Sequence, residues 1–160
     1  MQKAPYEIDM EKLANYYYKF GLYGWKLSDE DRGYLIPCIV NLAFSAEIAI
    51  KMQLPNKQGG HDLESLFNLL DQEIQESVIN SVINKYHLIE SICLQDKKLA
   101  FSCKNSIDFF TSLSNCKFSF VEARYIYEEK YLETNKYPTF MLILTASLLN
   151  RDLLKDLRSF

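Results

Sequence analysis

Residues 34–54 read YLIPCIVNLAFSAEIAIKMQL, and this apolar tract decides the fold. It is about as long as a membrane-spanning helix. It also contains Asn41, Glu47 and Lys51, however, and Pro37 lies near its start. Charged side chains are costly at that depth in lipid, so we predict a buried helix, running from about residue 29 to 54 and bent at Pro37. Because the tract is apolar nearly all round, it should be the central helix of a bundle.

The segment before this tract predicts a first helix over residues 8–20, which Asp9 can cap. Its apolar residues share one helical face, with the spacing i, i+3, i+4 and i+7: Leu13, Tyr16, Tyr17 and Phe20. Two glycines in GLYGWKLSDED, residues 21–31, are expected to end the helix. Ser28 and Asp31 have the spacing of a capping box for the second helix.

The segment after the tract repeats the helical spacing in residues 63–70, through Leu63, Leu66, Phe67 and Leu70. The period continues over DQEIQESVINSVINKY, residues 71–86. Asp71 and Gln72 mark either a corner between two helices or a point within one continuous helix. Residues 87–103 fit a helix, an irregular segment or a small hairpin, and we favour helix or irregular structure.

Three further helices are expected in the rest of the chain. One begins at about Asn105, and one covers residues 120–131. The last begins with Pro138 as its first residue and continues over residues 139–158. The pattern therefore predicts an all-α bundle of five to seven helices, in a single domain over residues 1–160.

Composition narrows the class of protein. The chain has 160 residues, of which 48% are hydrophobic, and a formal net charge of −3. The chain therefore lacks the excess of basic residues that most nucleic-acid-binding proteins have. Its negative charge also disfavours adsorption to an anionic membrane. The four cysteines form no C-x-x-C pair, and two histidines do not complete the usual zinc spacings, so we expect no metal and no cofactor. Cys38, Cys93 and Cys103 should be buried free thiols of a cytoplasmic protein.

A first candidate site joins Glu47, Lys51, His61 and Asp62. Glu47 and Lys51 are four residues apart, in the favourable order for a helical ion pair. A short loop then leads to His61, so antiparallel packing of the two helices places Lys51 near this turn. Two interpretations stay open: a helix cap with a local ion pair, or a small acid–base or anion-binding site.

A second candidate site surrounds Arg124, with Tyr125, Tyr127 and Glu128. A buried, unpaired guanidinium is very costly, so Arg124 should pair with Glu128 or with Glu47 across the bundle. Arg124 then has one of two roles. It is part of an ion-pair lock between helices, or it is a fork-shaped donor for phosphate or carboxylate beside tyrosines that stack on a base.

Aromatic residues are concentrated in residues 15–25, NYYYKFGLYGW. Such rings can stack on the bases of single-stranded nucleic acid. Few lysines or arginines accompany them, so core packing or contact with a partner is the better supported use.

The order of these parts resembles HEPN-domain proteins, small helical bundles found in antiviral defence and toxin–antitoxin systems. The resemblance covers about residues 30–155, with residues 1–27 as an N-terminal helix and connector. It rests on NLAFSAEIAIKMQL from residue 41, GGHDLESLFNLL from residue 59 and FVEARYIYE from residue 120. It implies an up-and-down helical bundle, frequent homodimerisation and an association with RNA.

Many HEPN proteins are metal-independent ribonucleases with an arginine, four to six further residues and then a histidine. Histidine can move protons while arginine stabilises a charged phosphate. Here YIYEEKYLE follows Arg124, so this motif is absent. The resemblance therefore implies a non-catalytic protein, forming a homodimer and binding a protein or RNA partner. The alternatives are an atypical ribonuclease using Arg124 with His61 or Glu128, and a purely structural bundle. The residues expected to bind are Glu47, Lys51, His61, Asp62, Arg124 and Tyr125.

Overall fold

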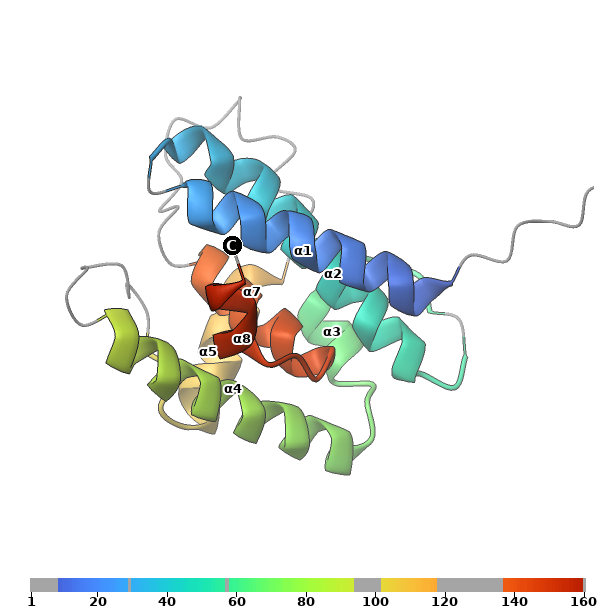
Figure 1. Ribbon diagram of the computed structural model, residues 1–160. Coiled ribbons are helices and arrows are strands. Elements are labelled where there is room, and N and C mark those ends of the chain that lie inside the picture. Colours follow the sequence, from blue (N-terminus) through green and yellow to red (C-terminus); the bar gives the residue numbers. More distant parts are fainter. Residues whose placement is uncertain (1–8, 29, 57, 94–101, 118–136, 160) are drawn as a thin grey trace, which may run out of the picture.

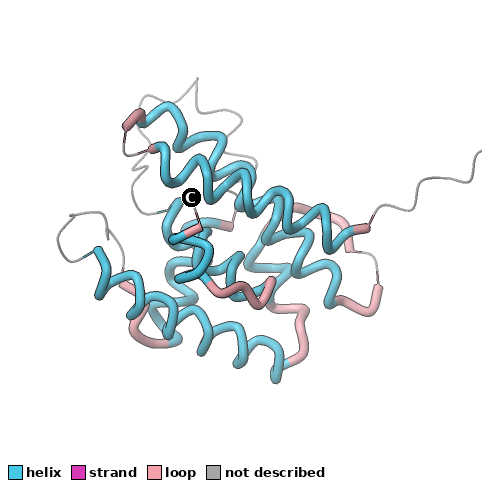
Figure 2. The backbone as a smooth tube through the Cα atoms, viewed as in Figure 1, coloured by secondary structure: helices cyan, strands magenta, loops and turns pink. Residues whose placement is uncertain are grey.

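The computed structural model describes residues 9–28, 30–56, 58–93, 102–117 and 137–159. Within these ranges the chain forms seven α-helices and one 3-10 helix, without a strand (Figures 1 and 2). The predicted all-α bundle is confirmed. The elements are α1 (Met10–Leu27), η1 (Arg32–Tyr34), α2 (Leu35–Gln53), α3 (Leu63–Phe67), α4 (Gln72–Cys93), α5 (Ser106–Cys116), α7 (Tyr137–Leu148) and α8 (Leu153–Arg158).

The bundle has α1 and α2 side by side on one side and α4 on the opposite side (Figure 1). Between them lies α7, which contacts α1, α2, α4 and α5. Residues 139–147 of α7 are all buried, so α7 is as central as α2. One hydrophobic cluster extends from Tyr18 on α1 through these helices to Leu153 on α8. This burial of apolar area is the main stabilising term of the fold.

The apolar helix of residues 32–53 is long and apolar enough to cross a membrane by length and composition alone. In the bundle, however, 56% of its most apolar window is buried against other parts of the chain. Pro37 lies in the first turn, where its missing N–H costs no helical hydrogen bond. These features agree with the predicted core helix.

The first helix is longer than predicted, because it continues through both glycines to Leu27. A Cβ atom built at Gly21 lies 2.5 Å from the Leu42 side chain, and one at Gly24 lies 3.2 Å from Cys38 Cβ. The glycines therefore allow α1 and α2 to approach closely. Ser45 Oγ also donates to the carbonyl of Ala14 over 2.6 Å across this contact. The expectation that the glycines end the helix was wrong, because tertiary packing outweighs their low helix propensity.

The apolar face that the spacing of Leu13, Tyr16, Tyr17 and Phe20 defines is not the buried face of α1. Tyr16 and Phe20 are 56% and 65% exposed, while the buried residues of α1 are Ala14, Tyr18, Gly21, Leu22 and Gly24. The helix is apolar on two faces, and the face with small residues packs against α2. Asp9 caps the helix as expected and accepts a hydrogen bond from the Lys12 N–H over 3.0 Å.

The start of the second helix differs from the prediction. Ser28 is the C-cap of α1, and its Oγ donates to the Trp25 carbonyl. Asp31 caps η1 by accepting from the Gly33 N–H over 2.7 Å, and α2 begins only at Leu35. Ser28 and Asp31 therefore serve two different helix ends and form no capping box.

Asp71 lies at a corner, because α3 ends at Phe67 and α4 begins at Gln72. The predicted apolar stripe of α3 is buried, as expected. The next helix, α4, extends to Cys93, while residues 94–101 of the possible hairpin lie outside the described residues. Asn105 caps α5, which confirms the helix expected from that point. The helix expected over residues 120–131 lies outside the described ranges.

The helix predicted over residues 139–158 is in fact two helices. It ends at Leu148 as α7, and Asn150 takes a left-handed conformation with a φ of 50°. Asp152 then caps α8 by accepting from the Lys155 N–H over 3.1 Å. Asparagine tolerates this backbone region better than most residues, so the chain can turn here. The turn brings α8 against α1.

Candidate functional site

Glu47 lies at the centre of a polar cluster at the end of α2. Its side chain is only 6% exposed, and both of its carboxylate oxygens are bonded. Lys51 Nζ lies 2.7 Å from Oε1, and His61 Nδ1 lies 2.9 Å from Oε2. Lys51 also donates to the Gly60 carbonyl over 2.9 Å. The structure therefore brings together three of the four residues of the first candidate site.

The local sequence explains this arrangement. The four-residue spacing places Glu47 and Lys51 on one face of α2, as predicted. Gly60 has a φ of 90°, a conformation that glycine adopts without steric cost. The loop can therefore turn its Gly60 carbonyl towards Lys51 while His61 reaches Glu47. The cluster ties the loop to α2.

Asp62, the fourth residue, has a different role. It is the N-cap of α3, and its Oδ1 accepts a hydrogen bond from the Ser65 N–H over 3.0 Å. The helix cap that the first interpretation expected is therefore Asp62 and not His61. The start of α3 is also held by the Leu63 N–H, which donates to the Lys117 carbonyl over 3.1 Å.

The Glu47–His61 contact is suited to proton transfer as well as to a structural role. A buried carboxylate on Nδ1 orients an imidazole and favours the tautomer with its proton on Nδ1. The His61 side chain is 47% exposed, so the ring also meets solvent. The arrangement can hold an oriented proton donor or acceptor, or it can lock the loop by an ion pair. The second candidate set, with Arg124, Tyr125 and Glu128, lies outside the described residues.

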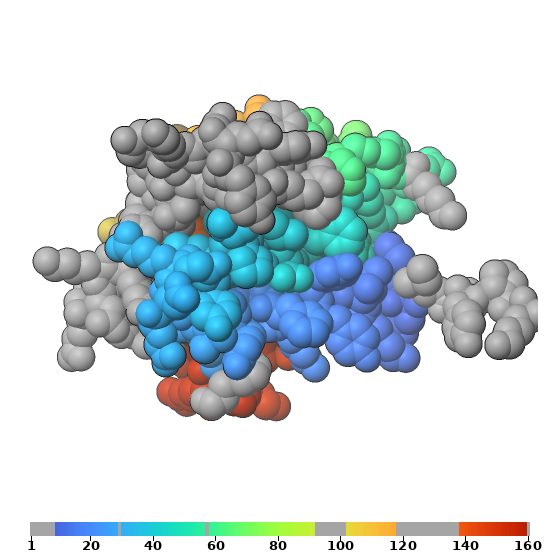
Figure 3. Space-filling view, turned by 90° about the horizontal axis from the view of Figure 1, so that it is seen from above, coloured from blue at the N-terminus to red at the C-terminus, as the bar shows by residue number. Residues whose placement is uncertain are grey.

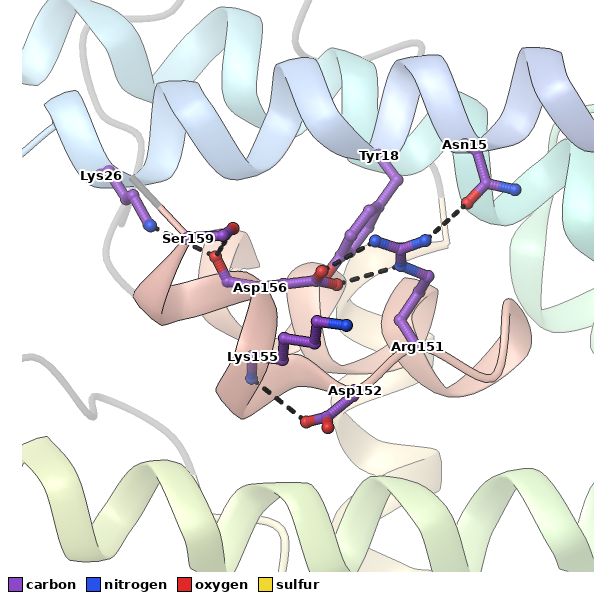
Figure 4. Close-up of polar contacts among 8 residues, drawn as sticks. All are labelled: Asn15, Tyr18, Lys26, Arg151, Asp152, Lys155, Asp156 and Ser159. Carbon is purple, nitrogen blue, oxygen red and sulfur yellow. Dashed lines mark hydrogen bonds and ion pairs between the residues drawn. The ribbon is translucent and has the colours of Figure 1, made fainter.

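A second polar cluster joins α1 to α8 and was not expected from the sequence (Figure 4). Asp156, which is buried, accepts hydrogen bonds from the Tyr18 hydroxyl over 3.0 Å and from the Arg151 guanidinium over 3.0 and 2.7 Å. The guanidinium also lies over the Tyr18 ring, 5.6 Å from its centroid. Lys26 Nζ donates to the carbonyl of Asp156 over 3.3 Å. The cluster fastens the last described helix to the first.

The electrostatics of this second cluster agree with a structural lock. Burial, and then the neighbouring Asp156 carboxylate, raises the pKa of the Tyr18 hydroxyl well above its usual value. The hydrogen bonds to Asp156 raise the pKa of Arg151, and desolvation lowers the pKa of Lys26. Every polar group of the trio Tyr18, Arg151 and Asp156 has a partner. Near α8, the sequence has two local signals for this cluster: Asp152, which forms the cap, and the neighbouring Arg151. Tyr18 is far away in the sequence, so no local pattern linked it to them.

Tyr18→Phe tests the pH dependence of this lock. The raised pKa of Tyr18 contributes stability below the unfolded-state value of 10.0, and this contribution is lost as the pH rises above it. We expect Tyr18→Phe to lower the free energy of unfolding by about 1 kcal/mol at pH 7, because a hydrogen bond is lost. Above pH 10, the free energy of unfolding of the variant should fall less steeply with rising pH than that of the wild type. Urea unfolding at pH 8 and pH 11 measures both effects. Tyr16→Phe, which changes an exposed tyrosine, should follow the wild type.

Cysteine chemistry finds little support in the described part of the chain. Cys38, Cys103 and Cys116 are buried free thiols, and burial raises the pKa of Cys38 and Cys103 to about 12. Such thiols are weak nucleophiles at neutral pH. The side chain of Cys93 lies outside the described residues. Across the described ranges, no group of three His, Cys, Asp or Glu side chains is placed to hold a metal ion.

An open hollow of about 550 Å³ lies between α4 and the start of α8. Its lining includes Ser77, Asn80 and Asn84 of α4, with Lys85 on the same side and Arg151 opposite. Lys85 donates to Ser81 Oγ over 2.8 Å, and desolvation lowers its pKa. Most residues that line the hollow are polar, and the Arg151 guanidinium within it is already bound to Asp156.

An exposed row of aromatic side chains runs along α1, and we call it the aromatic stripe: Tyr16, Phe20 and Tyr23. These side chains are 56%, 65% and 51% exposed. Seen from above, α1 (blue) runs beside α2 (cyan) along one open face of the molecule (Figure 3). Large apolar side chains that gather on a surface often mark an interaction site.

Comparison with known proteins gave no relatives. No family model matches the chain, no curated protein matches it, and no solved structure matches it.

Proposed function

We propose that this chain is a non-catalytic, HEPN-like helical protein that acts by binding a macromolecular partner, in microbial or phage defence or in a toxin–antitoxin pair. The observation that carries the binding role is the aromatic stripe on α1. The described residues include eight large hydrophobic side chains that are exposed. Six of these belong to α1, η1 and α2: Met10, Tyr16, Phe20, Tyr23, Tyr34 and Met52. Exposure concentrated on one layer favours a binding face over scattered surface residues.

The resemblance to HEPN proteins supports the proposal through its parts. The apolar helix with Glu47 and Lys51 is α2, and the following HDL segment begins α3. An all-helical bundle is also the class of fold that the resemblance implies. The defence role comes from this resemblance alone.

The non-catalytic part of the proposal is supported by the contacts of the first candidate site. Both oxygens of Glu47 are bonded to Lys51 and His61, and Asp62 caps α3. These bonds give each residue a role in holding the loop against α2. These structural roles explain the contacts of the cluster, and no catalytic role is needed to explain them.

Phe20→Asp tests the binding role. A carboxylate in the middle of the aromatic stripe should weaken association at least about 30-fold, because burying an unpaired charge at an interface is costly. Sedimentation equilibrium measures self-association, and fluorescence anisotropy with a labelled 20-nucleotide single-stranded RNA measures RNA binding. Ile107→Asp is the matched control, since Ile107 is 76% exposed on α5 and away from the stripe. Equal association by the two variants, or a wild-type chain that binds nothing, contradicts the proposal.

A second candidate function is an atypical, metal-independent ribonuclease, and the Glu47–His61 contact favours it. A histidine oriented by a buried carboxylate is a suitable general acid or base. Arg124 or Glu128 is the further group proposed for this reaction.

If the chain cleaves RNA, His61→Gln should lower the rate at least about 100-fold, the usual contribution of a general acid or base. Cleavage of mixed RNAs in EDTA, followed on denaturing gels, measures this rate, and Arg124→Ala tests the phosphate-binding group. His87→Gln is the matched control, because His87 is a half-exposed histidine on α4 that meets Glu90. Cleavage that His61→Gln abolishes and His87→Gln keeps would replace the non-catalytic proposal. Unchanged RNA at high protein concentration rejects this candidate.

A further inference from the structure

Two hollows along α4 form one groove, which we call the α4 groove. The hollow of about 550 Å³ between α4 and the start of α8 shares Ser77 and Ser81 with a second hollow of about 400 Å³, which lies between α4 and the end of α7. On α4, the lining extends from Glu73 to Leu88, about 22 Å at a rise of about 1.5 Å per residue. The opposite side is formed mainly by residues 147–153, where the chain turns from α7 into α8 (Figure 1). An extended peptide of roughly six or seven residues covers this length.

Two asparagine side chains on the α4 side of the groove have free carboxamides. Asn80 and Asn84 are exposed, and neither makes a side-chain hydrogen bond to a described residue. They are about one helical turn apart, roughly 6 Å along the helix axis. In an extended peptide, main-chain groups on one side recur at every second residue, about 6.6 Å apart. A carboxamide carries both a donor and an acceptor, so the two side chains can pair with successive main-chain groups of such a peptide.

The charges of the groove differ in sign between its two ends. Near the start of α4, the charged residue of the lining is Glu73. At the other end, the groove and the hollow beside it are lined by cations and one carboxylate: Lys85, Arg151, Lys155 and Arg158, with Asp152. Arg151 is balanced by its bonds to Asp156, and the remaining charges leave this end positive. An occupant with an acidic group at one end and a basic group at the other therefore matches the groove.

Lys85 is the cation best placed to meet an acidic group of an occupant. Its ammonium has three donors, and one of them is bonded to Ser81 Oγ over 2.8 Å. Partial burial lowers the pKa of Lys85 by more than the Asp152 carboxylate raises it. A carboxylate brought by an occupant would give this partly desolvated cation a charge-assisted hydrogen bond.

The lining of the groove disfavours single-stranded nucleic acid. Among the described residues, no aromatic side chain lines either hollow, so no ring is available to stack on a base. Leucine side chains contribute apolar surface instead, at Leu88, Leu148 and Leu153. A row of amides beside small apolar surfaces suits a peptide main chain and its apolar side chains.

We infer that the α4 groove binds an extended peptide of a partner protein, with an acidic residue of the peptide beside Lys85 and a basic residue beside Glu73. Lys85 and Glu73 are about 18 Å apart along α4, so the two charged residues of the peptide lie about six positions apart and point to the same side. Asn80 and Asn84, between them, bind the main chain. The groove lies on the side of the bundle opposite the aromatic stripe of α1, so this site is additional to the proposed binding face (Figure 1).

An array of octapeptides tests the groove. Each peptide has aspartate at the second position and lysine at the eighth, and the positions between them vary among alanine, serine, valine and leucine. The strongest binder is synthesised with a fluorescent label and titrated with the full chain by fluorescence anisotropy. Asn80→Ala and Asn84→Ala should each weaken binding at least about fivefold, because each variant loses its hydrogen bonds to the main chain of the peptide. Gln72→Ala, which removes an exposed amide of α4 outside the groove, is the matched control and should bind like the wild type.

A double-mutant cycle tests the pairing of the acidic residue with Lys85. Lys85→Gln should weaken binding at least about fivefold, and so should a peptide with asparagine in place of the aspartate. The two changes together should weaken binding little more than either alone, because both remove the same ion pair. Circular dichroism checks that each variant is folded. Losses that simply add would show that Lys85 and the aspartate do not meet, and would reject the inference.

Three further outcomes would also overturn the inference. The first is an array in which no peptide binds more tightly than its neutral counterpart, with asparagine and glutamine at the two charged positions. The second is peptide binding that Phe20→Asp weakens and Asn84→Ala does not, which assigns the peptide to the aromatic stripe and leaves the proposed binding role intact. The third is binding of the labelled RNA that Asn84→Ala weakens, without any peptide binding, which assigns the groove to RNA.

Discussion

Asp156→Ala should lower the free energy of unfolding by about 3 kcal/mol. The substitution leaves the Arg151 guanidinium without its two charge-assisted hydrogen bonds and the Tyr18 hydroxyl without its acceptor. Removing one member of a buried ion pair commonly costs 3–5 kcal/mol, and the partial exposure of Arg151 places this case at about the lower end. Urea unfolding followed by circular dichroism measures the change.

Asp152→Ala is the control for Asp156→Ala, because it also removes a carboxylate from α8. Asp152 is exposed and only caps the helix, so its loss should cost no more than about 1 kcal/mol. Equal losses for the two variants contradict a lock centred on Asp156. Adding Arg151→Met to Asp156→Ala should recover part of the loss, because the uncompensated cation is then removed.

Gly21→Val should be at least as damaging, with an expected loss of about 3 kcal/mol or more. A Cβ atom at this position lies 2.5 Å from Leu42 Cγ and 3.2 Å from the Leu42 backbone nitrogen. Leu42 is fully buried, so its side chain has little room to move, and α1 must shift away from α2. The gain in helix propensity over glycine is well below 1 kcal/mol and does not offset this clash. Thermal unfolding of the purified variant measures the effect.

Gly59→Val is the matched control, because a Cβ atom at Gly59 meets no heavy atom within 4 Å. It should stay within about 0.5 kcal/mol of the wild type, as most exposed substitutions do. If Gly21→Val were equally harmless, the close approach of α1 and α2 would not depend on the glycine. Gly21→Ala should lie between the two, since its smaller clash is partly offset by better helix propensity.

The sequence predicts the fold well where the apolar pattern allows one answer. The segment of residues 63–70 has one apolar stripe with helical spacing, and all four of its side chains are buried: Leu63, Leu66, Phe67 and Leu70. The helix α1 allows two answers, because Tyr16 and Phe20 are as apolar as the residues on its inner face. Periodicity cannot show which face meets α2. The close fit between Gly21 and Leu42 decides it, and that fit exists only in three dimensions.

The turn between α7 and α8 had a local signal that the apolar pattern obscured. Asn150 is suited to a left-handed conformation, and Asp152 is suited to an N-cap. The leucines on both sides keep the helical period, however, so residues 139–158 resemble one helix. Short capping signals therefore deserve more weight than an unbroken apolar pattern.

The two polar clusters differ in how far they could be predicted. Glu47 and Lys51 are neighbours on one helix, and a short loop leads to His61, so the sequence alone places them near one another. Tyr18 and Asp156 are 138 positions apart, and no local pattern links them. Short-range chemistry is readable from spacing, whereas a contact between distant helices depends on the packing of everything between them.

The same long separation determines when the fold can be completed. A ribosome adding about 5–20 residues per second needs on the order of ten seconds to synthesise the chain between Tyr18 and Asp156. During that time α1 can pair with α2, but the partners of its Tyr18 hydroxyl and Lys26 ammonium on α8 have not yet been synthesised. Closing so long a chain segment also carries a large entropic cost, so the α1–α8 contact should be among the last to form. The nascent chain is therefore most vulnerable to proteases and to misassociation along the side of α1 that α8 later covers.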